Sequence, residues 1–412
     1  MWSVEPTTKC PDRVPSQQRT MSRATPIPDD LPATGAWRPG DPAGDRRFHT
    51  LPTDRPLQLE SGAHLDRVDV AYETWGTLAP SGDNAVLVCH ALTGDSHAAG
   101  RDGWWEGLIG PGRAIDTDRW FVVCSNVLGG CQGTTGPASV DPATGRPLGS
   151  SFPVVTIRDM VRVQASLADG LGITRWRAVV GGSMGGMQAL EWAITYPDRV
   201  GSLVLASTTA EASAQQIAWS HIGRSAILAD PGFRGGDYYD AAPGEGPWRG
   251  LMVARMCAQV TYRSDEVFAD RFHRSVIDRF EFSDAPVFDI ENYLDYHGVK
   301  LVRRFDANSY LRLNRAMDLH DVARGRGSRR RALERVSGPV LVSSVRSDGL
   351  YPPVQQLALV DEFESIGLPV EHIEIDSPHG HDAFLIETQL LGPAVRRFLE
   401  DRLPPEEDHD RR

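Results

Sequence analysis

Lysine is nearly absent from this chain. Of its 412 residues only Lys9 and Lys300 are lysines, so arginine supplies nearly all of the 43 basic side chains. A P-loop that binds nucleotide phosphates needs a lysine after its glycines, and a pyridoxal enzyme needs one for its Schiff base. Lys9 stands near the start of the chain and Lys300 follows His297-Gly298-Val299. The sequence therefore supports neither kind of site.

A basic surface and a long apolar run are lacking as well. The chain has 43 Lys and Arg against 55 Asp and Glu, a formal net charge of −12, which leaves no broad positive surface for nucleic acid or anionic lipid. No apolar run approaches the ~20 residues that cross a bilayer, and nothing near the start resembles a secretory signal. We therefore expect neither nucleic acid nor a membrane among its partners.

Cysteine usage indicates a reduced compartment. The five cysteines are odd in number and widely spaced, without a C-x-x-C pair. We expect a cytoplasmic protein whose thiols are buried as small hydrophobic groups. Neither H-E-x-x-H nor a Cys/His cluster occurs, so the sequence predicts no metal and no cofactor. The cysteines are Cys10, Cys89, Cys124, Cys131 and Cys257.

The two ends of the chain differ from its middle. The first 50 residues hold eight of the 29 prolines and few apolar residues in any periodic arrangement, so we expect a disordered tail over 1–50. Met21 is a second candidate for the first residue. The acidic, apolar-poor residues 404–412 are expected to fray.

Between these ends, short apolar runs alternate with helical spacing. Continuous apolar strands separated by amphipathic helices are typical of a parallel sheet covered on both faces. Residues 207–337 are mostly helical in pattern, after which the alternation resumes. We therefore predict one α/β core, formed by 51–206 and 338–403, with a helical insertion at 207–337. The expected strands are 68–73, 85–89, 121–124, 178–180, 203–205, 339–343 and 370–375, with helices at 160–171 and 187–196.

The sharpest motif is Gly181-Gly182-Ser183-Met184-Gly185, which matches G-x-S-x-G. Alone it is weak, but a predicted strand ends before it and a predicted helix follows. This is the tight turn that holds the nucleophilic serine of α/β hydrolases, and side chains at the flanking glycines would collide across it. The turn also places the Met184 N–H beside the hydroxyl, as one donor of an oxyanion hole.

A serine nucleophile needs a base and a group that orients the base. In α/β hydrolases these follow as Asp or Glu and then His, each after a later strand. Asp348 and His381 occupy such places, with His379 as a rival base. The second oxyanion donor is expected in the loop after an early strand, and we assign it to the N–H of Leu92. His90 in that loop is expected to be structural.

Six stretches of sequence extend beyond any hydrolase motif. They are GGSMGGMQALEW (181–192), NVLGGCQGTTGP (126–137), GHDAFL (380–385), HALTGD (90–95), TIRD (156–159) and RFDANSY (304–310). Together they resemble the homoserine O-acetyltransferases over roughly residues 50–400. The resemblance implies an α/β-hydrolase fold with a helical lid, a homodimer formed through that lid, and a place in methionine biosynthesis. It also implies ping-pong transfer from acetyl-CoA through Ser183 to L-homoserine.

The resemblance also assigns the substrate contacts. Arg224 would bind the homoserine carboxylate and Asp382 its ammonium. In related enzymes that use succinyl-CoA, an arginine commonly stands two residues after the triad aspartate; Leu350 occupies that position, which implies an acetyl donor.

Other functions stay open on the sequence alone. The alternatives are homoserine or serine O-succinyl- or O-acetyltransfer within the same family, a serine esterase, and a non-catalytic protein on this fold. One methylene separates homoserine from serine and is worth only about 1–3 kcal/mol in a pocket. The run Arg324, Arg326, Arg329, Arg330 and Arg331 suggests phosphate binding, although a solvated loop explains it as well.

Overall fold

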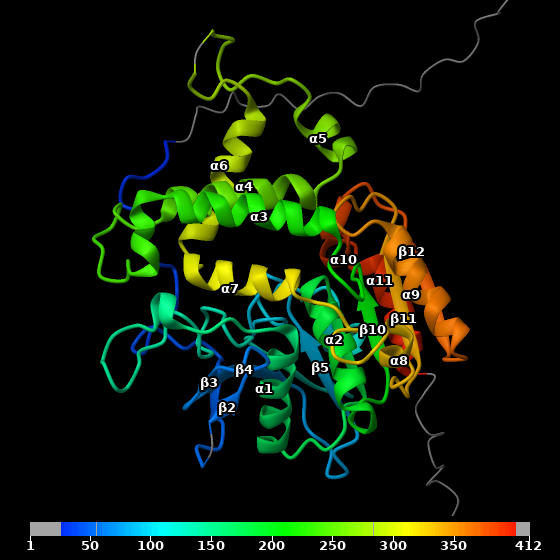
Figure 1. Ribbon diagram of the computed structural model, residues 1–412. Coiled ribbons are helices and arrows are strands. Elements are labelled where there is room, and N and C mark those ends of the chain that lie inside the picture. The colour runs from blue at the N-terminus through cyan, green and yellow to red at the C-terminus, as the bar shows by residue number, and fades with distance from the viewer. Residues whose placement is uncertain (1–25, 55, 283, 401–412) are drawn as a thin grey trace, which may run out of the picture.

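The computed structural model describes residues 26–54, 56–282 and 284–400. Its centre is an eight-stranded sheet in the order β1-β4-β8-β5-β9-β10-β11-β12 (Figure 1). Neighbouring strands from β8 to β12 pair in parallel, whereas β4 pairs antiparallel with β8, and β1 antiparallel with β4. The strands are β1 (Arg47–Thr50), β4 (Asp69–Trp75), β5 (Ala85–Cys89), β8 (Phe121–Ser125), β9 (Ala178–Gly182), β10 (Leu203–Ala206), β11 (Val340–Val345) and β12 (Val370–Ile375).

Alternate residues of the buried strands face two separate cores. On one face, Leu87 of β5 belongs to a core shared with α1 (Ile157–Gly170), α2 (Met184–Thr195) and α9 (Pro353–Ser365). On the other, Val86 belongs to a core shared with α10 (Ala383–Ile386) and α11 (Thr388–Glu400). Both cores bury whole strands, which is why these strands read as continuous apolar runs. The short pairs β2 (Leu57–Gln58) with β3 (His64–Leu65) and β6 (Ile109–Gly110) with β7 (Ile115–Asp116) lie outside the sheet.

The chain between β10 and β11 forms helices that cover one end of the core. Figure 1 shows α3 and α4 as an outer layer, with α7 between that layer and the sheet. We call this helical region the lid. Its helices are α3 (Ala214–Ala229), α4 (Trp248–Tyr262), α5 (Asp265–Phe272), α6 (Asp289–Val302), α7 (Ala307–Asp318) and α8 (Arg329–Leu333). Among the described residues, no helix is long and apolar enough to cross a bilayer.

The N-terminal segment corrects one expectation. Residues 1–25 and 401–412 lie outside the described residues, but 26–50 are not a disordered tail. Leu31 is buried, the Gly35 N–H donates a 2.9 Å hydrogen bond to the Phe305 carbonyl, and β1 pairs with β4. The segment has no core of its own. It is ordered by hydrogen bonds and apolar cover from distant parts of the chain, which its composition cannot reveal.

Candidate active site

Ser183 occupies the turn between β9 and α2. Its backbone has φ 55° and ψ −125°, a conformation that residues with a Cβ rarely adopt and that must be held by its surroundings. The Ser183 N–H donates to the Ala206 carbonyl at 2.9 Å, and the Thr208 hydroxyl donates to the Ser183 carbonyl at 2.8 Å. The neighbouring strand thus holds the turn. The serine is buried.

Gly181 and Gly185, on either side of the serine, must be glycines because a Cβ at either position would lie too close to neighbouring backbone atoms. A Cβ on Gly181 would lie 2.2 Å from the Gly185 carbonyl oxygen, and a Cβ on Gly185 would lie 2.1 Å from the Cys89 carbonyl oxygen. Neither approach is possible for a residue with a side chain. The glycine spacing of the motif therefore follows from a sharp turn that is packed against β5.

His381 and Asp348 meet although 33 positions separate them in the chain. His381 lies on the 3-10 turn Gly380–Asp382 after β12, and its Nδ1 is 2.7 Å from Asp348 Oδ2. The other Asp348 oxygen accepts hydrogen bonds from the N–H groups of Leu350 (2.9 Å) and Tyr351 (2.8 Å). The carboxylate is buried and fully bonded, so its orientation toward the imidazole is fixed.

The environment of His381 favours the imidazolium. Burial acts to lower the pKa of His381, but the charge and hydrogen bond of Asp348, with a further contribution from Asp382, outweigh it and raise that pKa. A histidine that gains a proton readily and is held by a carboxylate through Nδ1 can act as a general base through Nε2.

The rival histidine has a different partner. His379 Nε2 lies 3.7 Å from Glu387 Oε1, and the side chain is 37% exposed. Asp348 is bonded to His381. The structure thus brings His381, and not His379, together with the aspartate.

Tyr351 connects the serine to the histidine. Its ring stacks on the His381 imidazole with centroids 4.9 Å apart. Burial, Tyr262 and Asp348 raise the pKa of Tyr351, while a side-chain hydrogen bond with Ser183 acts against them. Tyr351 was missed in the sequence because only its place three residues after Asp348 hints at this position, and its contacts arise from the fold.

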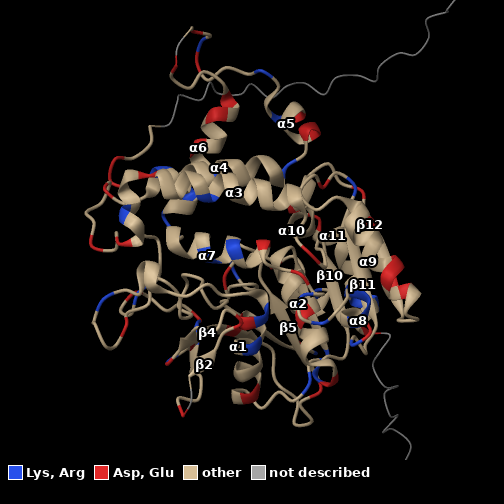
Figure 2. Ribbon diagram, in the orientation of Figure 1, with Lys and Arg blue, Asp and Glu red and all other residues tan. Residues whose placement is uncertain are grey.

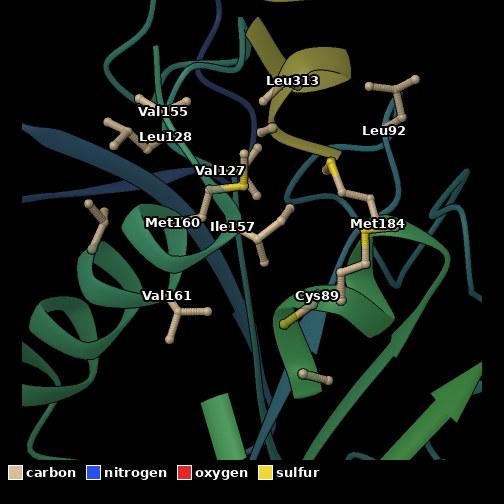
Figure 3. Close-up of a cluster of buried hydrophobic side chains, with 14 of the residues drawn as sticks. Cys89, Leu92, Val127, Leu128, Val155, Ile157, Met160, Val161, Met184 and Leu313 are labelled. Carbon is tan, nitrogen blue, oxygen red and sulfur yellow. The ribbon is translucent and has the colours of Figure 1, made fainter. Parts of the chain in front are cut away.

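The expected oxyanion donors lie at the junction of β5 and α2. Figure 3 shows Leu92 and Met184 with Cys89 in one apolar cluster. Met184 is the first residue of α2, so its N–H has no acceptor within the helix, and among the described residues neither this N–H nor that of Leu92 donates to a protein acceptor. The Met184 N–H directly follows Ser183 in the chain, and an oxyanion hole requires two unused donors of this kind.

His90 holds the loop that carries Leu92. Its Nδ1 lies 2.8 Å from the Ala91 carbonyl, and its Nε2 accepts from the Val127 N–H at 3.2 Å. Burial lowers the pKa of His90, which suits a neutral ring with one donor and one acceptor. Gln188 of α2 donates to the His90 carbonyl at 3.2 Å, so the loop is fixed against the helix that begins after Ser183.

The two residues expected to bind the acceptor are each in an ion pair. Arg224 of α3 is buried, with Nη1 2.5 Å from Asp318 Oδ2. Asp382 Oδ2 lies 3.2 Å from Nη2 of Arg263, which follows α4. Asp318 and Arg263 were not identified in the sequence, because nothing local marks either as a partner of the site.

Leu350 is fixed by its backbone. Its N–H donates to Asp348, and its carbonyl accepts from Gln216 of α3 at 2.9 Å, which ties the triad loop to the lid. Arg346, the nearest arginine in sequence, lies 2.5 Å from Asp376 and is half exposed. Its guanidinium is thus engaged at the surface.

The arginine run is largely neutralised by carboxylates. Arg324 pairs with Glu60 at 2.9 Å and Arg326 with Glu191 at 2.7 Å. The remaining described pairs of the run join Arg329 to Glu211 and Glu362, and Arg330 to Glu334. The run stabilises the chain after α7 and offers little free charge to phosphates.

One group of potential metal ligands has no signal in the sequence. Single ligand atoms of Asp45, Glu73 and His97 lie within 4.8 Å of one another. His97 Nδ1 is 2.8 Å from Glu73, and its Nε2 is 2.8 Å from the Arg101 carbonyl. Although burial acts to lower it, the pKa of His97 is raised by these two hydrogen bonds and by acidic neighbours. A protonated ring with both N–H groups engaged has no lone pair for a metal.

Comparison with known proteins agrees with this geometry. A family model described as alpha/beta hydrolase fold matches residues 84–388. A homoserine O-acetyltransferase of Symbiobacterium thermophilum is 52% identical over 367 residues, 86% of this chain and 95% of that protein. The solved homoserine O-acetyltransferase of Bacillus anthracis has a TM-score of 0.79 at 31% identity and covers 86% of this chain and 98% of its own.

An esterase shares the architecture to the same degree. Esterase E22 has a TM-score of 0.79 at 29% identity, covering 86% of this chain and 99% of its own. The fold by itself therefore does not separate transfer from hydrolysis. The 52% identity over nearly the whole of a homoserine O-acetyltransferase places this chain with the transferases and not with the esterases. It also confirms the resemblance seen in the six motifs. The chain belongs to the homoserine O-acetyltransferase family of α/β hydrolases.

Proposed function

We propose that the chain transfers the acetyl group of acetyl-CoA to the hydroxyl of L-homoserine, with Ser183 as the carrier. The serine chemistry is supported by the 2.7 Å hydrogen bond between His381 and Asp348, with Tyr351 in contact with that histidine and with a buried serine on a strained turn. The choice of transfer over hydrolysis is supported by the 52% identity to a homoserine O-acetyltransferase. The product would enter methionine biosynthesis.

The first half-reaction acetylates the enzyme. Ser183 Oγ attacks the thioester carbonyl while His381 Nε2 takes its proton, and the N–H groups of Leu92 and Met184 stabilise the oxyanion. The carbon–sulfur bond then breaks, and the coenzyme A thiolate leaves with the proton from His381. Asp348 stabilises the imidazolium between these events. Side chains and backbone groups supply each step, so the proposal includes no cofactor or metal.

The second half-reaction repeats the chemistry with homoserine. Its hydroxyl replaces water as the nucleophile, gives its proton to His381 and attacks the acetyl carbonyl; Ser183 leaves and regains the proton. Transfer exceeds hydrolysis only if the acceptor is held better than water, which effective molarity can provide. Following the family resemblance, we assign the acceptor carboxylate to Arg224 and the ammonium to Asp382; both are charged side chains with little exposure.

Quaternary state and location belong to the same proposal. Large apolar side chains are exposed on α3 and α4, among them Leu228 (59%) and Val253 (47%), and Figure 2 shows few charges on these helices. Such a surface favours a homodimer through the lid. All described cysteines are free thiols, which supports a reduced, cytoplasmic setting.

The test is a coenzyme A release assay with four pairings of donor and acceptor. Acetyl- or succinyl-CoA is combined with homoserine or serine, and product is identified by mass. We expect the acetyl-CoA and homoserine pair to have the highest kcat/KM. Release of coenzyme A that is independent of any acceptor, with free acetate as product, would identify an esterase instead.

A further inference from the structure

Arg255 lies on α4, two ring contacts away from the proposed base. Its Cζ lies 5.2 Å from the centroid of the Tyr262 ring, and the centroids of that ring and of the His381 imidazole are 5.9 Å apart. Arg255 and Tyr262 share one face of α4, because seven residues make two helical turns, whereas the exposed Val253 and Val260 stand on the opposite face. Arg255 therefore faces the triad and not the outer surface of the lid.

Two further helices bring a histidine and a second arginine to this place. Gln259, one turn after Arg255 on α4, donates a 2.7 Å hydrogen bond to the Tyr293 hydroxyl of α6. The ring centroids of Tyr293 and His297 are 4.4 Å apart. The Arg271 Cζ, on α5, lies 4.8 Å from the centroid of the Tyr293 ring. Side chains of α4, α5 and α6 thus meet at one junction of the lid.

Positive charge gathers at this junction. The pKa of His297 is lowered to about 4, by burial first and then by the charges of four nearby cations. These are Arg255, Lys300, Arg263 and Arg271. Lys300 follows His297 by about one turn of α6, and its side chain is exposed.

Three of these four cations have no acidic partner. Arg263 is paired with Asp382 at 3.2 Å, but the other three take part in no ion pair within the described part of the chain. They are Arg255, Arg271 and Lys300, and we call them the basic cluster. The chain as a whole has a net charge of −12, and most arginines of the run at 324–331 are paired with carboxylates. Like charges held together repel one another, so an anion bound among them would be stabilised.

We propose that the basic cluster binds the phosphates of the coenzyme A part of the donor. This inference rests on the proposed function and extends its donor site. Coenzyme A carries its thioester at one end of a flexible pantetheine arm, and a diphosphate and a ribose phosphate at the other. Arg255 is half buried and nearest the triad, whereas Arg271 and Lys300 are exposed. The arm would therefore run outward from Ser183, past Tyr262, to phosphates held by guanidinium groups that can donate two hydrogen bonds at once.

The matched probe is S-acetylpantetheine, which has the thioester and lacks every phosphate. Acetylation of Ser183 is followed by intact mass, and kcat/KM is measured with acetyl-CoA and with the probe. In Arg255→Gln the ratio of kcat/KM for acetyl-CoA over the probe should fall about tenfold or more, because a charge-assisted contact to phosphate is lost. In wild type, added salt should lower the same ratio.

An unchanged ratio in Arg255→Gln would overturn the inference. An equal loss with both donors would overturn it too, because Arg255 would then serve the fold or the acetyl group. Arg331→Gln is the control: it removes an exposed arginine from the run at 324–331 and should leave the ratio in place. A lower ratio in Arg331→Gln alone would place the phosphates at that run instead. If wild type is acetylated by neither thioester, the proposed function itself fails.

A second variant covers the case in which Arg255→Gln does not fold. The double variant Arg271→Gln with Lys300→Gln changes two exposed side chains, and such surface changes affect stability little. Its ratio of kcat/KM values should fall severalfold, and titration calorimetry should show weaker binding of coenzyme A but not of pantetheine. Coenzyme A bound as tightly as by wild type would contradict a phosphate site at the basic cluster.

Discussion

At the scale of single residues, the chemistry depends on a base whose proton affinity is set by its neighbours. Asp348 raises the pKa of His381 against the effect of burial. Because the base must be neutral to accept a proton, acetylation of Ser183 should become faster as the pH rises through that pKa. The acid limb of kcat/KM for acetyl-CoA should therefore lie above about 6.5, the ordinary imidazole value.

Removing the aspartate charge should move that limb. In Asp348→Asn we expect the acid limb of kcat/KM to lie at lower pH and the plateau value to fall by about 10³–10⁴-fold.

The choice of base is tested by two histidine variants. His381→Ala should stop acetylation, whereas His379→Ala should keep most of it, because His379 lies against Glu387. Stopped-flow release of coenzyme A across pH checks all three. Loss in His379→Ala with retention in His381→Ala would show that the base is misassigned.

The donor preference is also a residue-scale question. Leu350 offers the succinyl carboxylate no partner, and burying that charge unpaired is costly. Leu350→Arg should shift the ratio of kcat/KM for succinyl-CoA over acetyl-CoA upward by roughly tenfold. Val354→Arg, which places the same charge at an exposed position of α9, should leave the ratio in place. Comparable values for both donors in wild type would place the chain in the succinyl branch.

Residues with a local signature were predictable, and those defined by tertiary contacts were not. Ser183, Asp348 and His381 follow strands in a fixed chain order, so motif and order located them before the structure brought Asp348 and His381 into contact. Tyr351, Asp318 and Arg263 act through partners that are distant in the chain and meet only in the folded molecule. No spacing along the chain encodes such contacts.

At the scale of elements, α7 is the piece on which the lid and the N-terminal segment converge. Asp306 precedes this helix, and its carboxylate accepts four hydrogen bonds: from the Ser309 N–H (2.8 Å), the Tyr238 hydroxyl (2.7 Å), the Tyr239 hydroxyl (3.1 Å) and the Thr34 hydroxyl (2.8 Å). Asp306→Ala removes a helix cap and leaves buried donors unpaired. We expect a loss of about 2–4 kcal/mol in the free energy of unfolding.

The control is a cap with a single bond. Ser328 caps α8 through one 3.2 Å hydrogen bond from the Arg331 N–H, so Ser328→Ala should cost only about 0.5–2 kcal/mol. Urea unfolding of both variants gives the comparison. Equal small losses would mean that Asp306 does not join these segments.

Element prediction succeeded where burial is uniform. The run 85–89 coincides with β5, whose residues are all buried, because strands buried on both faces carry continuous apolar sequence. The expected strand at 370–375 coincides with β12 as well, although this edge strand is mostly half buried. β1 was missed because it is a four-residue edge strand, Arg-Phe-His-Thr, with mostly exposed side chains. Its order comes from pairing with β4 and not from its own pattern.

At the scale of the whole molecule, the exposed apolar surface of α3 and α4 sets the expected assembly. Leu228→Glu and Val253→Glu should each shift a dimer toward monomer, because burying a carboxylate at an apolar interface is unfavourable. Light scattering after size exclusion measures the mass. Val354→Glu on α9, where the side chain is also exposed, should not shift it. A monomeric wild type would refute the lid-mediated dimer.

The central claim is that Ser183 carries the acetyl group between two substrates. Its most direct test is intact-mass measurement after mixing the protein with acetyl-CoA and no acceptor. The account predicts one added acetyl group on wild type, none on Ser183→Ala, and loss of the adduct when homoserine is added, with O-acetylhomoserine formed in equal amount. An unmodified wild type that still turns over, or an adduct that persists in Ser183→Ala, would contradict it.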